Sequence, residues 1–182
     1  MTVLNKLGGI RLPALVALFA AVMMLFCLIL PYAVANEETS DMLEEYSDVV
    51  INPEWEMTGA DMQSLSITTL TLKLNDYYQG AQDELGGIIL IALLAACALL
   101  CLLTILFPLM NRAIPTIFVA LLSFGPFYLL SLIMNEDWGV GATGGSYAWG
   151  VGYYLFHAAV VVAIGGAVWL LVEKMKEKKA KK

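Results

Sequence analysis

Four long stretches of the chain contain no Asp, Glu, Lys or Arg, and the charged residues lie between and beyond them. The stretches are Leu12–Asn36, Leu85–Asn111, Ala113–Asn135 and Trp138–Val172. A helix crosses the hydrocarbon core of a bilayer with about 20 apolar residues, so each stretch is long enough to span it. The pattern predicts an all-α integral membrane protein built as a four-helix transmembrane bundle.

The segment between the first two stretches has a different pattern. Apolar residues within Met42–Val50 recur at helical spacing and predict a short helix. Val49–Ile51 predicts a strand, and the alternation within Ser64–Leu74 predicts a second strand with a bulge near Thr69. A turn is expected at Thr58–Asp61. We therefore expect a small β-prone extracytoplasmic loop domain, a short helix plus a β-hairpin, between the first two spans.

These patterns divide the chain into four spans and five connecting or terminal segments. The predicted spans are residues 12–35, 86–107, 113–134 and 150–172. The other segments are an N-terminus at 1–11, an acidic loop at 36–85, a cytoplasmic turn at 108–112, a glycine-rich loop at 135–149 and a basic tail at 173–182.

The first span has an alternative interpretation as a secretory signal peptide. Ala33-Val34-Ala35 matches the small-x-small pattern that precedes a cleavage site. Against cleavage, the apolar run Leu12–Leu30 is longer than the usual signal core of about 7–15 residues. The length favours a retained span, and both alternatives stay open.

Charge predicts the orientation of the spans. The chain is 60% hydrophobic and only 14% charged, whereas about a quarter of the residues in a soluble domain are charged, which excludes soluble globular and disordered classes. With both termini cytoplasmic, nine of the ten basic residues lie inside and only Lys73 lies outside, as the positive-inside rule requires. Because the basic residues are few and lie beside the membrane, a nucleic-acid partner is also excluded. The apolar spans are typical of a bacterial cytoplasmic-membrane protein.

This plan of four spans with a long first outer loop resembles that of the claudin-like tetraspan proteins. The first loop of those proteins carries a Trp-containing motif with two cysteines, whereas Trp55 stands here in a loop without cysteine. The resemblance is one of topology, and it implies neither a function nor a residue role.

His157 is the one histidine of the chain and falls in the fourth predicted span. An ionisable residue within a span is a functional candidate, and Glu136 and Asp137 are its nearest predicted acidic partners at the outer face. Together they are the residues on which a membrane enzyme would depend. A neutral imidazole hydrogen-bonded between helices is the favoured interpretation, because no span contains a carboxylate.

Two other sequence patterns do not indicate a nucleotide-binding or metal site. The sequence Gly139–Gly144 matches G-x-G-x-x-G, but it lies between two predicted spans rather than in a βαβ unit, so its glycines predict tight turns. Cys97 and Cys101 predict packing rather than a metal site. No catalytic motif is present, and we expect no enzyme activity, no metal and no cofactor.

The outer loops contain three tryptophans, Trp55, Trp138 and Trp149. Trp138 and Trp149 are expected to belong to an aromatic belt at the outer membrane interface, and all three are also candidates for contact with a partner. The leading hypothesis is a non-enzymatic accessory, assembly or sensing subunit that uses its acidic loop for contact. Its partners would be the lipid bilayer and either another membrane protein or further copies of itself. The alternative is a transport or channel component that lines a pore as an oligomer, with Ser123, Ser131 and His157 between the helices.

Overall fold

The computed structural model describes residues 6–7, 10–53, 55–81 and 84–180. Parts of the predicted N-terminus at 1–11, two acids of the loop (Glu54 and Asp83) and the last two lysines of the tail lie outside these residues. The described part of the chain is mostly helical, at 74%. It divides into two units. A helical unit comprises Met1–Leu25, Ala96–Gly125 and Leu155–Lys182, and a mixed unit comprises Phe26–Ala95 and Pro126–Tyr154.

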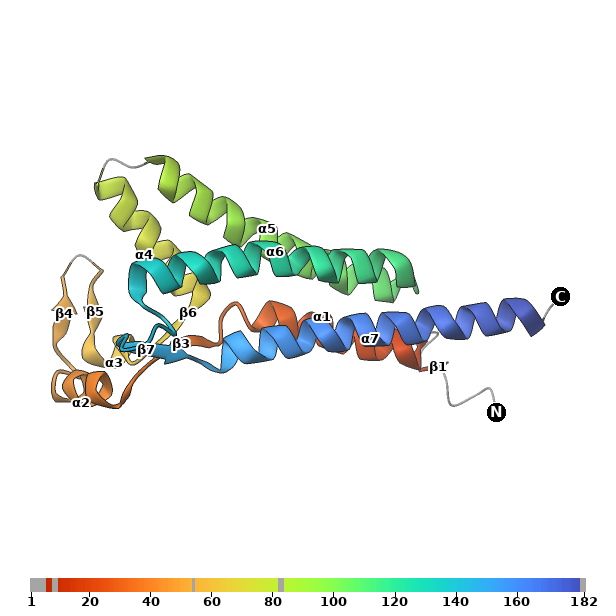
Figure 1. The fold of residues 1–182 in the computed structure, drawn as a ribbon, viewed down its shortest axis with the longest axis horizontal. Helices are drawn as coiled ribbons and strands as arrows, with labels where there is room; N and C mark the ends of the chain where they lie inside the picture. The colour runs from red at the N-terminus through yellow and green to blue at the C-terminus, as the bar shows by residue number, and fades with distance from the viewer. Residues whose placement is uncertain (1–5, 8–9, 54, 82–83, 181–182) are drawn as a thin grey trace. The chain divides into compact units, whose positions relative to one another are not determined.

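Among the described residues, three helices are long and apolar enough to cross a membrane (Figure 1). They are α5 (Glu84–Leu109), α6 (Ala113–Trp138) and α7 (Val151–Ala180), with 26, 26 and 30 residues. At 1.5 Å per residue, even the shorter two reach about 39 Å, more than the hydrocarbon core of about 30 Å. The predicted membrane class is confirmed at this level.

The first apolar stretch is shorter as a helix than the sequence predicts. Helix α1 (Leu12–Phe26) has 15 residues and reaches only about 22 Å, so the structure does not confirm a four-helix membrane bundle. After Phe26 the chain turns, and the amides of Ile29 and Leu30 both donate to the Phe26 carbonyl. Pro31 then begins strand β3, because proline disfavours a helical conformation in the residue before it.

A three-stranded antiparallel sheet organises the mixed unit. Strand β3 (Pro31–Ala35) lies in its centre, between β6 (Ser64–Ser66) and β7 (Tyr147–Trp149). Ala33 is opposite Leu65 on one side and Trp149 on the other. The residues predicted to end the first span therefore form the central strand of a sheet.

Short elements surround this sheet. Helix α2 (Glu37–Glu45) begins at Asn36, whose side chain accepts a hydrogen bond from the Thr39 amide. Strands β4 (Val50–Asn52) and β5 (Met57–Thr58) form a hairpin, and the predicted turn after it is helix α3 (Gly59–Met62). Thr58 caps α3, and its amide and hydroxyl groups donate to Asp61 and hold the pKa of that carboxyl below its usual value.

The predicted strand Ser64–Leu74 is wrong beyond Ser66. Residues 67–80 form helix α4 (Ile67–Gly80), which Ser66 caps by accepting a hydrogen bond from the Thr69 amide. Ile67, Leu70 and Leu74 are buried, as the 3.6-residue period of a helix requires, whereas Leu72 is 46% exposed. The serine cap and the helical spacing of the buried residues therefore favour a helix here, although the residues themselves have a high β-propensity.

The helical unit is held by close approach of small residues and by one ion pair. A Cβ atom on Gly166 of α7 would lie 2.8 Å from the Ala17 backbone nitrogen of α1, so glycine permits this contact. The Arg11 guanidinium donates to both carboxylate oxygens of Glu177, at 3.0 and 2.8 Å. Arg11 belongs to β2 (Ile10–Arg11), which pairs with β1 (Lys6–Leu7).

Candidate functional site

The β4–β5 hairpin holds Trp55 at its tip. The Trp55 amide donates to the side-chain oxygen of Asn52 at 3.2 Å. The Lys73 ammonium group of α4 donates to the Trp55 carbonyl at 2.8 Å. Glu56, the next residue, has a φ of 51°, so the backbone turns sharply there. These bonds fix the backbone of Trp55 at the tip of the hairpin.

The end of α6 supplies a second tryptophan. The rings of Trp138 and Trp55 are stacked, with centroids 4.6 Å apart and an angle of 27° between planes. Tyr147 of β7 meets Trp138 edge-on at 6.4 Å, and its hydroxyl donates to the Met62 carbonyl at 3.0 Å. Burial raises the pKa of Tyr147, so this hydroxyl stays protonated and remains a donor.

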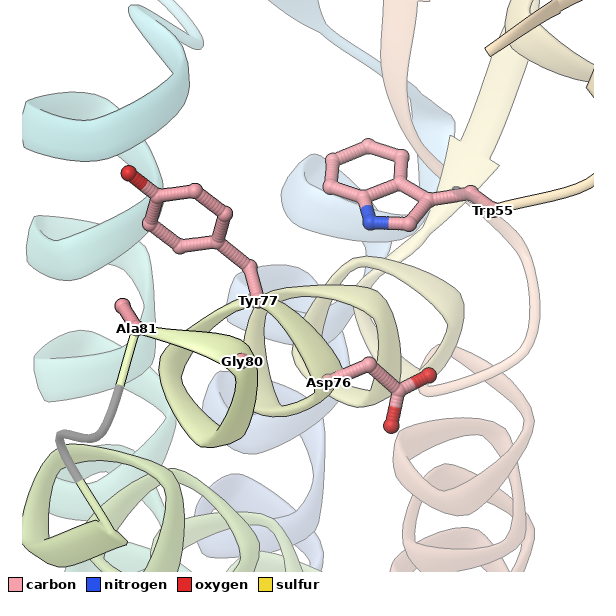
Figure 2. Close-up of a pocket in the computed structure, with 5 residues that line it drawn as sticks. All are labelled: Trp55, Asp76, Tyr77, Gly80 and Ala81. Atoms are coloured by element: carbon pink, nitrogen blue, oxygen red, sulfur yellow. The ribbon is translucent and has the colours of Figure 1, made fainter. Parts of the chain in front are cut away.

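Helix α4 adds two tyrosines beside the stacked pair. The Tyr78 hydroxyl donates to a carboxylate oxygen of Asp137 at 3.1 Å and so connects α4 with the end of α6. Tyr77 is 54% exposed. Its ring and the indole of Trp55 extend on the same side of α4, across a hollow (Figure 2).

These side chains line two adjoining hollows. One has a volume of about 390 Å³ and is lined by Trp55, Asp76, Tyr77, Gly80 and Ala81. The other, of about 410 Å³, is lined by Asn52, Trp55, Met62, Leu74, Tyr77, Tyr78, Asp137 and Trp138. Since Trp55 and Tyr77 line both hollows, we treat them as one site, the aromatic groove, defined by Trp55, Asp76, Tyr77, Tyr78, Asp137 and Trp138.

The charge of the mixed unit is strongly negative. By sequence it contains fourteen acidic residues and one basic residue, Lys73. Among the described residues that line the two hollows, two are acidic and none is basic. The groove therefore offers aromatic ring faces and carboxylates, a combination suited to binding rather than to nucleophilic catalysis.

The structure brings some of the predicted site residues together. Trp55, Trp138 and Asp137 share the groove. Trp149 lies in another cluster of the mixed unit, where it stacks on Tyr153 at 4.3 Å. Glu136 is exposed near the end of α6.

His157 belongs to the helical unit, whereas Glu136 and Asp137 belong to the mixed unit. Its imidazole is half-buried and meets the ring of Phe124 edge-on at 5.3 Å. A catalytic grouping of these three residues stays a prediction. Within the described residues, no group of three His, Cys, Asp or Glu side chains is arranged to hold a metal ion.

Sequence reasoning missed Asp76, Tyr77 and Tyr78 as site residues, because α4 was expected as a strand that ends at Leu74. A signal for them was present. Two adjacent tyrosines stand in the otherwise polar stretch 75–79. Neighbouring aromatic residues in such a stretch indicate a packing or binding surface.

Protein-family models, curated proteins and solved structures gave no match to this chain. Two features define its class: three helices long and apolar enough to span a membrane, and an acidic mixed unit that carries an aromatic groove.

Proposed function

We propose that this protein is a non-enzymatic polytopic membrane protein that acts as an accessory, assembly or sensing subunit. It contacts its partner through the acidic mixed unit. The observation that carries the proposal is the aromatic groove. There Trp55 from the acidic loop stacks on Trp138 from the end of an apolar helix, and Tyr77 stays more than half exposed. Exposed aromatic side chains fixed by hydrogen bonds are typical of recognition surfaces.

The composition of the apolar helices favours an accessory role over that of a pump or a proton-coupled carrier. Residues 85–109, 113–135 and 151–172 contain no Asp, Glu, Lys or Arg, so the charges that pumps and proton-coupled carriers use within the bilayer are missing there. The acids are concentrated instead in the mixed unit. The groups suited to recognition therefore lie in the acidic loop and at the polar ends of the apolar helices, outside their uncharged stretches.

The membrane arrangement that accompanies this role has four spans, with α1 as the short first span and both termini in the cytoplasm. The charge distribution supports it, because Arg112 follows α5 and the lysines of the tail end α7, whereas Glu84, Glu136 and Asp137 lie at the opposite helix ends. A bacterial cytoplasmic membrane is the proposed location, and the mixed unit then faces outward.

Site-specific photocrosslinking tests the proposal. A photoreactive amino acid replaces Tyr77 in the groove or, as a matched control, Tyr46, which is 44% exposed in the same unit and does not line the groove. Each tagged protein is purified from its native membrane in a mild detergent, and adducts are identified by mass spectrometry. We expect one stoichiometric partner with adducts from position 77 alone.

Two results would contradict the proposed contact. One is that no protein co-purifies at a stoichiometric level and no adduct forms at position 77. The other is that the partner is retained when residues 40–80, which include most of the groove, are deleted.

The alternative, an oligomeric pore, has less support. Its predicted polar lining includes Ser123 and Ser131, which are buried and donate to carbonyls of their own helix, Ala120 at 2.7 Å and Phe127 at 2.8 Å. A hydroxyl satisfied in this way is typical of serine packed within a membrane helix. Ion flux across the membrane of liposomes that contain the pure protein would support the pore.

A further inference from the structure

Four aromatic residues line the two hollows of the aromatic groove, and two of them, Trp55 and Trp138, stack on each other. They come from the hairpin tip (Trp55), from α4 (Tyr77 and Tyr78) and from the end of α6 (Trp138). The face of an aromatic ring attracts a cation within about 6 Å of its centre, and tryptophan does so most strongly. Because Trp55 and Tyr77 line both hollows, a ligand in either one meets an indole and a phenol ring.

The two carboxylates of the groove favour the same kind of ligand. Asp137 lines one hollow and Asp76 the other. The Tyr78 hydroxyl engages one Asp137 oxygen, and a carboxylate has two oxygens and about four acceptor positions. A cation held against the ring faces could therefore be neutralised without a further protein group.

The negative charge around the groove favours a cationic ligand over a neutral one. An excess of acidic residues around a site raises the local concentration of cations and repels anions. The single basic residue of the mixed unit, Lys73, donates to the Trp55 carbonyl and supports the hairpin rather than lining the groove. The two hollows, at about 390 and 410 Å³, also match the size of sites for small organic molecules.

We infer that the aromatic groove binds an alkylammonium group in the hollow that Asp137 lines, held by the faces of Trp55 and Tyr77 and neutralised by Asp137. This inference rests on the proposed function, since it names the chemistry that the mixed unit contacts. The group can belong to a soluble amine or to the headgroup of a lipid, and both present the same positive charge surrounded by carbon.

Choline binding to the purified full-length protein in a maltoside detergent tests the inference. Binding is measured by tryptophan fluorescence and calorimetry, and 3,3-dimethylbutanol serves as the uncharged analogue of the same shape. We expect choline to bind and the analogue to bind at least tenfold more weakly, with the choline affinity falling as salt is raised.

Matched variants assign the binding to the groove. Tyr77→Ala removes one ring, and we expect a three- to tenfold loss of affinity, which Tyr77→Phe restores because it keeps the ring. Tyr46→Ala is the control for an exposed tyrosine of the same unit outside the groove. Asp137→Asn is compared with Asp41→Asn on α2, which changes the net charge equally, and only the groove variant should weaken binding by more than threefold.

Lipid composition distinguishes the two sources of the ammonium group. In nanodiscs of phosphatidylcholine, a lipid headgroup that occupies the groove would compete with free choline and weaken its binding relative to discs of an uncharged glycolipid, which have the same net surface charge. Equal affinity in the two discs assigns the groove to a soluble amine. Either result supports the inference and names the source.

The inference is overturned if the uncharged analogue binds as well as choline, if Tyr77→Ala and Tyr46→Ala behave alike, or if choline does not bind. Each of these results leaves the proposed function standing when position 77 still crosslinks to a partner in native membranes. Loss of the crosslink with choline binding intact would instead remove the proposed protein contact and keep the ligand.

Discussion

At the scale of single residues, the glycine-rich segment after α6 shows how a loop is fitted to its neighbours. Gly139, Gly141 and Gly144 all have positive φ, at 63°, 73° and 77°. The sequence-based prediction of tight turns at these glycines is confirmed. They differ in surroundings, because a Cβ on Gly141 would lie 2.0 Å from the Trp149 ring, whereas a Cβ on Gly144 would meet nothing within 4 Å.

Alanine substitution at two of these glycines separates backbone strain from steric conflict. Gly144→Ala should cost about 1–2 kcal/mol, the usual penalty of a left-handed conformation with a side chain. Gly141→Ala should cost about 1–3 kcal/mol more, because the Trp149 ring must also move. Unfolding of both variants in detergent, followed by near-UV circular dichroism, measures the difference. Equal stabilities would mean that Gly141 does not lie against Trp149.

The tryptophans of the outer loops show how far residue-level reasoning reaches. Their polar surroundings in the sequence were enough to select Trp55 and Trp138 as contact candidates. The sequence carries no signal that these two rings stack, because their pairing depends on a hairpin tip and a helix end that are far apart in the chain. Trp149 stands in a similar sequence context, yet it stacks on Tyr153 in a different cluster.

At the scale of elements, α4 is the clearest difference between the predicted and the observed structure. Leu70, Leu72 and Leu74 alternate, and threonines precede them, which is typical of a strand. The same residues also fit a helix, in which Leu72 points away from the other two. Alternation over a few residues does not distinguish the two elements, and the Ser66 cap was the signal that decided it.

Two leucine truncations distinguish helix from strand at this position. In the helix, Leu70 is 1% exposed and Leu72 is 46% exposed, whereas a strand would place both on one face. We expect Leu70→Ala to cost about 2–5 kcal/mol and Leu72→Ala less than about 0.5 kcal/mol. Thermal unfolding of the two variants in the same detergent measures this contrast. Similar losses for both would support the strand.

Strand β3 bears on the signal-peptide alternative. It lies in the centre of the sheet, and Tyr32 and Ala33 are fully buried. Cleavage after Ala35 would remove this strand and leave β6 and β7 without their shared neighbour. The sequence pattern could not reveal this, because small residues that suit a cleavage site also suit a crowded central strand.

We therefore predict that residues 1–35 are retained in the mature protein. The intact mass of C-terminally tagged protein purified from membranes should include them. Ala35→Leu, which blocks a small-x-small cleavage site, should leave the processing state unchanged. A mature protein that begins at Asn36, and a longer one in the Ala35→Leu variant, would show that β3 is removed as part of a signal peptide.

At the scale of the whole molecule, hydropathy predicted the three long helices and the polar segment between α1 and α5. It did so because about 20 apolar residues have few alternatives to a membrane helix. Hydropathy failed at residues 27–35, where the apolar residues Cys27, Leu28, Tyr32 and Ala33 are buried within a turn and a strand of the protein rather than in a membrane helix. Apolar composition alone does not separate burial in lipid from burial in protein.

Orientation is the property of the whole molecule on which both proposals depend, and two introduced thiols test it. The native cysteines, Cys27, Cys97 and Cys101, are fully buried, so background labelling of the folded protein should be low. Met42→Cys places a thiol at a 55% exposed position of the mixed unit, and Lys178→Cys places one on the exposed end of α7.

A membrane-impermeant maleimide applied to intact cells should label the Met42→Cys protein at once and the Lys178→Cys protein only after permeabilisation. The reason is the basic tail of α7, because lysines beside a span are retained on the cytoplasmic side. The reverse result would place the aromatic groove in the cytoplasm. The groove would then face a compartment rich in soluble amines and the lipid headgroups of the cytoplasmic leaflet, and partners outside the cell could not reach it.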